Sequence, residues 1–266
     1  MHRRVILFVS AALAFAATGR AQIAEEATSA LPLGRVLPAV ASAGGVGGSF
    51  FRTSVQVYNP GGGPLNGRFL YHPANTAGSS VDPGLDFTIP AGETVSYPDI
   101  VAAMGQSGLG SLDLLLPSAS SSPAIVVARV YNDAGNDGTS GFTEEAINPA
   151  ENGDGGRVLK GGNSGFLLLP DDTDRFRFNI GVRTLSSSAS IQFTVRDASG
   201  AYVGAVSKTY SATYFAQQEA SVFLGLSLPP NGTIKVTVVG GSAMVYGATA
   251  DNTTNDPSIQ FARATS

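Results

Sequence analysis

Oxygen-bearing side chains gather in three loops of this sequence. These loops are residues 133–137, 171–174 and 251–256. Calcium prefers oxygen ligands, and the candidate ligands here are Asp133, Asp137, Asp251 and Asp256. No loop follows the spacing of an EF-hand, and Asp and Asn also bond their own backbone in tight turns. The turn interpretation is favoured, so we predict no resident metal ion and no other cofactor.

Nucleophilic catalysis would need a serine or cysteine beside a histidine. His72 is the only histidine after residue 21, the chain has no Cys, and no Gly-x-Ser-x-Gly segment is present. Zinc sites need several Cys or His ligands. The sequence therefore predicts neither kind of active site, and it predicts that His72 is a polar surface residue at the end of a strand.

Glycoside hydrolysis would need two carboxyl groups about 5–10 Å apart. The glutamates that could supply them are Glu93, Glu144, Glu145, Glu151 and Glu219. Three of the five lie in a polar stretch where solvated charge is expected, and the chain has no Trp to stack on a sugar ring. We predict that the protein is not an enzyme, and a secreted hydrolase is the third of three candidate functions.

Tyrosine rings could bind a carbohydrate or a peptide, because they present an apolar body and a polar hydroxyl. The candidate ligand contacts are Tyr58, Tyr71 and Tyr97. Tyrosine at strand positions is more often packed core, and the lack of Trp counts against sugar stacking. A flat strand of low charge, such as 165–169, could instead pair with another chain.

Residues 1–21 have the pattern of a signal peptide. Two arginines precede an apolar run over 5–17, and small residues lead to a cleavage site after Ala21. This run is shorter than the roughly 20 residues that span a bilayer. The formal net charge is −4 and the three lysines are scattered, which argues against nucleic acid as a partner. We expect a secreted or periplasmic protein that is not inserted in a membrane.

The elements that must position these residues are short strands. The chain holds 33 Gly and 15 Pro, and its apolar residues alternate in short runs, as in residues 51–58. One short helix is expected over 98–105, with Asp99 as its N-cap, and a second before Gly225. We predict an all-β fold with a first domain at 22–140, a polar linker at 141–163 and a second domain at 164–266.

The second half repeats the order of the first. The segment 243–257 is a strand followed by an Asp- and Asn-rich loop, and 124–138 is a similar segment. An Asn-Pro turn at 59–60, a Pro-Gly turn, a short helix and the closing Asp251-Asn-x-Thr-x-Asp-Pro257 motif resemble a group of exported bacterial proteins. That resemblance implies two tandem antiparallel β-sandwiches of immunoglobulin-like type, each with at most one short helix.

Three functions remain open at this point. The first is a non-catalytic, secreted or envelope-associated interaction or structural module whose partner is a protein or glycan of the cell envelope. The alternative is a carbohydrate-binding module, and the hydrolase is third.

Overall fold

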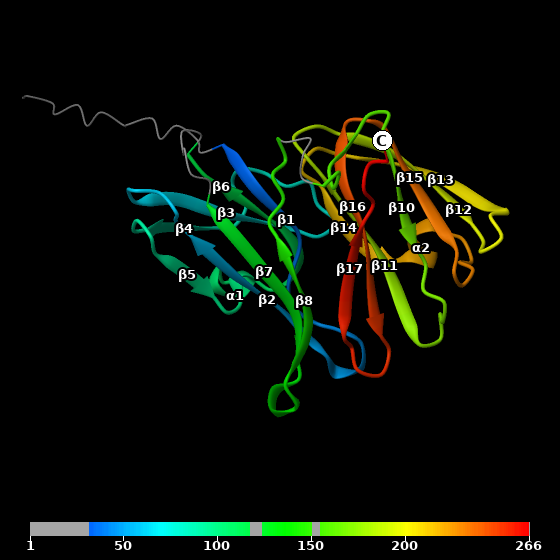
Figure 1. Ribbon diagram of the computed structural model, residues 1–266, viewed down its shortest axis with the longest axis horizontal. Coiled ribbons are helices and arrows are strands. Elements are labelled where there is room, and N and C mark those ends of the chain that lie inside the picture. The colour runs from blue at the N-terminus through cyan, green and yellow to red at the C-terminus, as the bar shows by residue number, and fades with distance from the viewer. Residues whose placement is uncertain (1–31, 118–123, 151–154, 266) are drawn as a thin grey trace, which may run out of the picture. The chain divides into compact units, whose positions relative to one another are not determined.

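The protein is built from antiparallel strands in three sheets (Figure 1). The computed structural model describes residues 32–117, 124–150 and 155–265, so the predicted signal peptide at 1–21 lies outside the described residues. Two short α-helices accompany the strands, α1 (Ile100–Ala103) and α2 (Ala220–Leu224). The predicted all-β class is confirmed, while the immunoglobulin-like topology stays a prediction.

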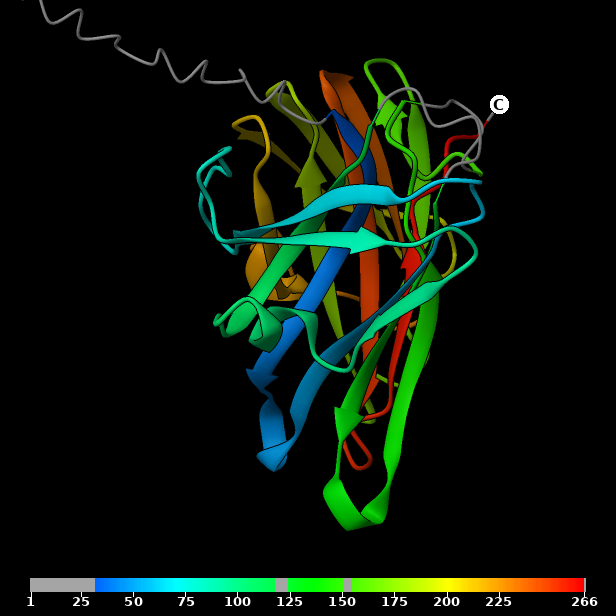
Figure 2. The same cartoon turned by 90° about the vertical axis from the view of Figure 1, so that its left-hand side faces the viewer.

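Sheet 1 has eight strands in the spatial order β4-β3-β6-β1-β2-β7-β8, and β5 pairs with β2 (Figure 2). The strands are β1 (Leu33–Gly44), β2 (Phe50–Tyr58), β3 (Leu65–Pro73), β4 (Gly84–Ile89), β5 (Thr94–Tyr97), β6 (Gly108–Leu115), β7 (Ile125–Asp133) and β8 (Thr139–Glu145). Buried side chains from most of these strands share one core, including Val55, Phe69 and Leu112.

Strand β1 lies in the middle of sheet 1, although it follows Pro32 and contains Pro38. It pairs with β6 along most of its length and with β2 at its end. The register to β6 shifts between Leu37 and Val40. Such a bulge tolerates Pro38, which cannot donate to the ladder. Leu37 and Val40 therefore face the core of sheet 1, while Val36 and Ala39 pack among residues of the second half.

The second half consists of sheets 2 and 3. Sheet 2 has the order β10 (Ser164–Leu168), β15 (Thr233–Gly240), β12 (Ala189–Arg196), β13 (Tyr202–Tyr210). Sheet 3 has the order β14 (Phe215–Glu219), β11 (Phe176–Thr184), β16 (Ser242–Asp251), β17 (Pro257–Phe261), with β9 (Leu159–Lys160) paired to β16. Alternate residues of both sheets form a common core, among them Phe193, Val236 and Ile180. One face of sheet 3 thus remains for contact with the first half.

Local sequence signals account for several elements. In β2, Val55 and Val57 are buried while Gln56 and Tyr58 are exposed, as the alternation predicted. Helix α1 begins after Asp99, whose carboxylate accepts from the Ala102 amide at 3.0 Å. Within the described part of the chain, no helix is long and apolar enough to cross a membrane.

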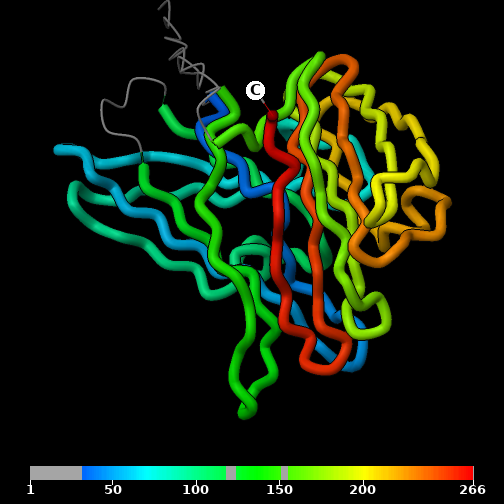
Figure 3. The backbone as a smooth tube through the Cα atoms, turned by 45° about the vertical axis from the view of Figure 1, so that its right-hand side comes forward, coloured from blue at the N-terminus to red at the C-terminus, as the bar shows by residue number. Residues whose placement is uncertain are grey.

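The range 141–163, predicted as a polar linker, contributes to the sheets. It contains most of β8 and all of β9, and Ile147 forms a bridge with Val36. Glu144 is buried there rather than solvated. The expectation was drawn from a polar composition, but strand pairing and contact with the second half cover these residues. Figure 3 shows β8 alongside β17.

Strand β10 is at the end of sheet 2, where pairing with another chain was considered. The Gln260 side chain accepts from the Leu168 amide at 2.9 Å and donates to the Leu168 carbonyl at 2.7 Å. Further along, the Thr265 amide donates to the Ser164 carbonyl. Residues near the C-terminus therefore occupy the open edge of β10, where a strand of another chain would have to pair.

Candidate functional site

The two halves of the protein meet through backbone hydrogen bonds and side-chain contacts. The Gly78 amide donates to the Thr213 carbonyl at 2.7 Å, and the Asn75 amide donates to the Phe215 carbonyl at 2.7 Å. Beside this junction, Ala39 of β1 packs with Tyr246 of β16. Sheet 3 is thereby held face-on to β1 of sheet 1.

A cleft of about 360 Å³ lies between these two surfaces. The wall from sheet 1 is apolar and carries two aromatic rings, and its larger side chains are Val46, Phe51, Leu109, Val130 and Phe142. The wall from sheet 3 carries four planar polar side chains, Arg177, Asn179, Gln217 and Glu219. The rest of this wall, including Tyr246, Ala250 and Ile259, is mostly apolar. A mainly apolar space of small-molecule size therefore has its polar side chains on the sheet 3 side.

Strand pairing aligns the polar wall. In β11, Arg177 and Asn179 alternate with Phe178 and Ile180, which point into the core between sheets 2 and 3. Across the ladder to β14, Asn179 is opposite Glu219. Residues two apart on one strand share a face, so the four polar side chains lie on one face of the sheet, two on each strand.

Tyr246 closes the inner end of the cleft. Its hydroxyl donates to Gln217 Oε1 at 2.7 Å, across β11 at the position of Gly181. A Cβ at Gly181 would collide with the Tyr246 ring, so glycine is needed there for this close approach. Burial raises the pKa of Tyr246 well above its usual value, which keeps the hydroxyl protonated as a donor.

The polar side chains of this wall differ in whether they already make hydrogen bonds within the protein. Arg177 donates to Asn255 Oδ1 at 2.7 Å and to Asn252 Oδ1 at 3.3 Å. Among the described residues, the Asn179 side chain and the Gln217 side-chain nitrogen make no hydrogen bond. These two amides are therefore the groups of this wall that can bond a ligand without breaking a protein contact.

Glu219 is an ionised acceptor at the end of β14. Its carboxylate accepts from the Ser221 amide and hydroxyl and from the Val222 amide, and so caps α2. Partial burial alone would raise its pKa, but the bonds from Ser221 and Val222 lower it below the usual range. The carboxylate is thus charged at neutral pH.

The tyrosines predicted as ligand contacts lie elsewhere. Tyr71 is 1% exposed in the core of sheet 1, where burial raises its pKa to about 12. Tyr97 packs edge-on against Phe69 with ring centroids 5.4 Å apart, and Tyr58 is partly exposed at the end of β2. None of the three lines the cleft. Sequence reasoning missed Asn179 and Gln217. Asn179 alternates with Phe178 and Ile180, whereas Gln217 lies in the polar run Gln-Gln-Glu and carries no such signal.

The candidate calcium ligands are engaged locally. Asp133 accepts from Arg52 at 2.9 Å and from the Gly135 amide. Asp251 accepts from the amides of Thr253 and Thr254 and from Arg175, and the backbone bonds are the main reason that its pKa falls to about 2.

The other two candidates lie at the surface. Asp137 is exposed in a 3₁₀ turn and Asp256 is exposed beside β17. Within the described ranges, no three His, Asp or Glu side chains come together as a metal site.

Turn chemistry therefore leads to a prediction about calcium. We expect the melting temperature of the purified protein to be the same in EDTA and in millimolar calcium, because Asp133 and Asp251 already satisfy backbone and arginine donors. A calcium-dependent rise, seen by differential scanning calorimetry, would contradict this interpretation.

His72 is the largest departure from the sequence prediction. It is buried in β3 rather than exposed, with Nδ1 at 2.7 Å from Asp82 and Nε2 at 3.1 Å from Asp113. Asp113 also accepts from Arg183 of β11 at 2.6 Å, and Arg183 donates to the Thr184 carbonyl. Burial alone would raise the pKa of Asp113, but Arg183 and His72 lower it.

This buried network joins the two halves and has no nucleophile. Both ring nitrogens of His72 face carboxylates, so neither faces the Ser111 hydroxyl of the neighbouring strand. The arrangement is an ionic junction, and it gives no evidence of catalysis.

Comparison with known proteins identifies no family. No family model matches the chain, and no curated protein matches it. Two solved structures of a lectin from Pleurotus ostreatus are similar in part, one in complex with GalNAc and one in the apo form. Their sequence identities are 12% and 11%, with TM-scores of 0.18 and 0.19. Each alignment covers 90% of this chain, and 86% or 85% of the lectin chain. TM-scores this low do not establish a common fold.

Glu144 lies next to the inner end of the cleft. It is on the same face of β8 as Phe142, and its charge interacts with Tyr246. Neither carboxylate oxygen has a hydrogen-bond partner. Burial raises its pKa to about 8, with Arg157 acting in the opposite direction. Glu144 therefore keeps its proton to a higher pH than an exposed glutamate does.

Proposed function

We propose that the protein is a non-enzymatic binding module and that it holds a glycan in the cleft between sheets 1 and 3. A pyranose ring has an apolar face of C–H groups and an edge of hydroxyls. The cleft offers the matching pair of walls, with Phe51 and Phe142 on one side and Asn179 and Gln217 on the other. This pairing of an aromatic wall with planar polar side chains is the observation that supports the proposal.

The same geometry disfavours a glycoside hydrolase. Within the described part of the chain, Glu219 is the one carboxylate among the residues that line the cleft, and its oxygens cap α2. Hydrolysis by the two-carboxylate route needs an acid and a second carboxylate across the substrate. Glu144 is buried behind the lining, Glu93 and Glu145 lie in none of the hollows described, and Glu151 lies outside the described residues.

A glycan array probed with the purified protein tests the proposal, followed by calorimetric titration of the hits. We expect Asn179→Ala to weaken binding roughly 3- to 10-fold, which is the value of one hydrogen bond. Gln218→Ala is the matched control, because Gln218 adjoins Gln217 on β14 but does not line the cleft. Silence on the array, or equal loss in both variants, would refute the site.

Contact with a protein is the second candidate function. Strand β13 is at the outer end of sheet 2, and Tyr202 and Val203 are exposed there. An open edge with exposed apolar side chains is the surface on which a partner strand can pair. Charged substitution at Val203 would abolish cross-linking to such a partner while leaving glycan binding intact.

We propose the finer architecture and the location together with this function. The protein is exported after cleavage near Ala21, and its two halves are related immunoglobulin-like domains divided near residues 140 and 164. Support comes from α1 and α2, each of which has an acidic N-cap and is followed by a glycine of positive φ, Gly105 or Gly225. N-terminal sequencing of the secreted protein tests the export.

A further inference from the structure

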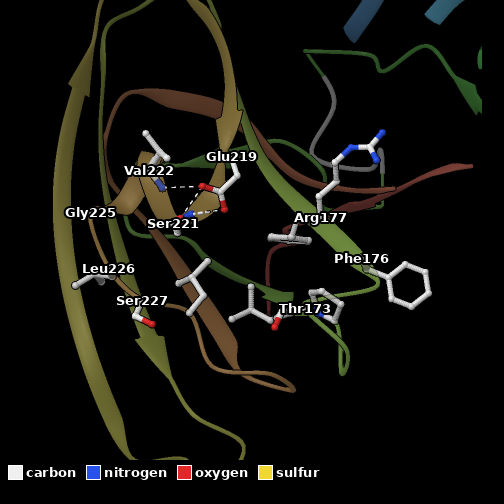
Figure 4. A pocket seen from close by; sticks show the side chains of 13 residues that line it. Thr173, Phe176, Arg177, Glu219, Ser221, Val222, Gly225, Leu226 and Ser227 are labelled. Carbon is white, nitrogen blue, oxygen red and sulfur yellow. Dashed lines mark hydrogen bonds between the residues drawn. The ribbon is translucent and has the colours of Figure 1, made fainter. Parts of the chain in front are cut away.

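The cleft adjoins a second hollow on the far side of Glu219. This hollow has a volume of about 630 Å³ and lies between α2 with its following turn and the start of β11 (Figure 4). Arg177 and Glu219 line both spaces. The two hollows therefore meet at these two side chains.

The second hollow, like the cleft, has polar and apolar groups side by side. Hydroxyls of Thr173, Ser221 and Ser227 surround it together with the Glu219 carboxylate (Figure 4). Leu226 and the well-exposed Val222 supply apolar surface. Hydroxyl-bearing and apolar groups side by side suit another sugar unit rather than a different kind of ligand.

The size of the two spaces bears on the length of the ligand. Each has the volume of a small-molecule site by itself, on the order of 300–1,000 Å³. A single ring would leave one of them empty, whereas a chain of repeating units would fill both. Of the four polar side chains on β11 and β14, Arg177 and Glu219 line both spaces, whereas Asn179 and Gln217 line the cleft.

The charged side chains where the two hollows meet indicate whether the ligand is itself charged. Glu219 is ionised there, and it accepts hydrogen bonds from hydroxyls but repels carboxylates and phosphates. Arg177 is the neighbouring cation, and its guanidinium is already bonded to the loop between β16 and β17. Arg177 and Glu219 carry opposite charges that offset each other where the hollows meet, so an uncharged ligand is favoured over an acidic one.

We infer that the ligand is a neutral, linear oligosaccharide that runs from the cleft over Glu219 into the second hollow. This inference rests on the proposed function and adds the length and charge of the ligand to it. The chain binds with its first units between Phe142 and Asn179 and with its later units beside Ser221 and Ser227.

A length series tests the inference. Malto-, cello- and manno-oligosaccharides of one to six units are titrated against the purified protein. We expect the affinity in one series to rise at least about 10-fold with length, because units in the second hollow add contacts. The double variant Thr173→Val/Ser227→Ala should remove most of that rise, whereas Asn179→Ala should weaken every length. Melting temperatures of both variants show whether they fold.

Each alternative outcome has a distinct meaning. Affinity that stays constant with length, or a double variant that weakens all lengths equally, overturns the inference and leaves the cleft as a site for a single unit. Tighter binding of oligogalacturonate than of the neutral chains overturns the assigned charge. No binding of any oligosaccharide overturns both the inference and the proposed function. Gln218→Ala should match the unaltered protein at every length.

Discussion

Replacing Arg183 by Met is expected to lower the free energy of unfolding by about 3–5 kcal/mol, because it leaves a buried carboxylate without its cation. Arg183 is 0% exposed and Asp113 is 6% exposed, so water cannot replace the lost partner. Asp113 would retain only His72. The measurement is urea unfolding followed by circular dichroism.

An exposed ion pair provides the matched control. Arg68 bonds Asp86 at 2.8 Å on the surface of sheet 1, with both side chains accessible to water. Such pairs contribute about 0–1 kcal/mol, so Arg68→Met should change stability little. Equal effects of the two substitutions would show that the buried network does not stabilise the junction.

The same network contributes to the response to acid, together with other carboxyl groups of lowered pKa such as Asp251. The pKa values of Asp82 and Asp113 are lowered in the folded protein against the opposing effect of burial. Groups with lowered pKa values stabilise the fold above their unfolded pKa, and the stabilisation is lost as the pH falls toward their folded pKa. The acid limb of the stability curve should accordingly be shallower in Arg183→Met.

Replacing Glu144 by Gln is expected to change how stability depends on pH between about 4.5 and 8. The folded pKa of Glu144 is about 8, against an ordinary value of 4.5. Between these two values the unfolded chain has lost the proton and the folded chain keeps it, so rising pH favours unfolding. Relative to the variant, the unaltered protein should lose up to about 1.4 kcal/mol of stability per pH unit in that window.

The neighbouring Glu145 is the control for this prediction. It lies on the opposite, exposed face of β8, so Glu145→Gln should leave the pH dependence unchanged. The free energy of unfolding is measured by urea at several pH values across the window. Parallel curves for Glu144→Gln and the unaltered protein would show that Glu144 is solvated or paired in solution.

Sequence patterns predicted the local features of this fold well. The alternation in β2, the Asp99 cap of α1 and the Asp251 turn all depend on residues a few positions apart. The features that were predicted wrongly depend on residues that are far apart in the sequence. His72 meets partners 10 and 41 residues away, and Arg183 reaches Asp113 over 70 residues.

The candidate site could not be predicted for the same reason. Phe142 and Asn179 come from different halves of the chain, and nothing in the periodicity of either strand shows that they face each other. Tyrosines were predicted as ligand contacts because of their side-chain chemistry, but Tyr71 is buried in the core of sheet 1. Glu144 looked solvated because its neighbours are polar, yet contact between β8 and the second half buries it.

Strand β1 has a consequence for cooperativity. One of its faces completes the core of sheet 1, and the other, through Val36 and Ala39, packs against residues of the second half. A strand with no solvent-facing side gains its stability from both neighbours at once. Its hydrogen-bond ladder therefore couples the folding of the two halves, although each half also has a core of its own.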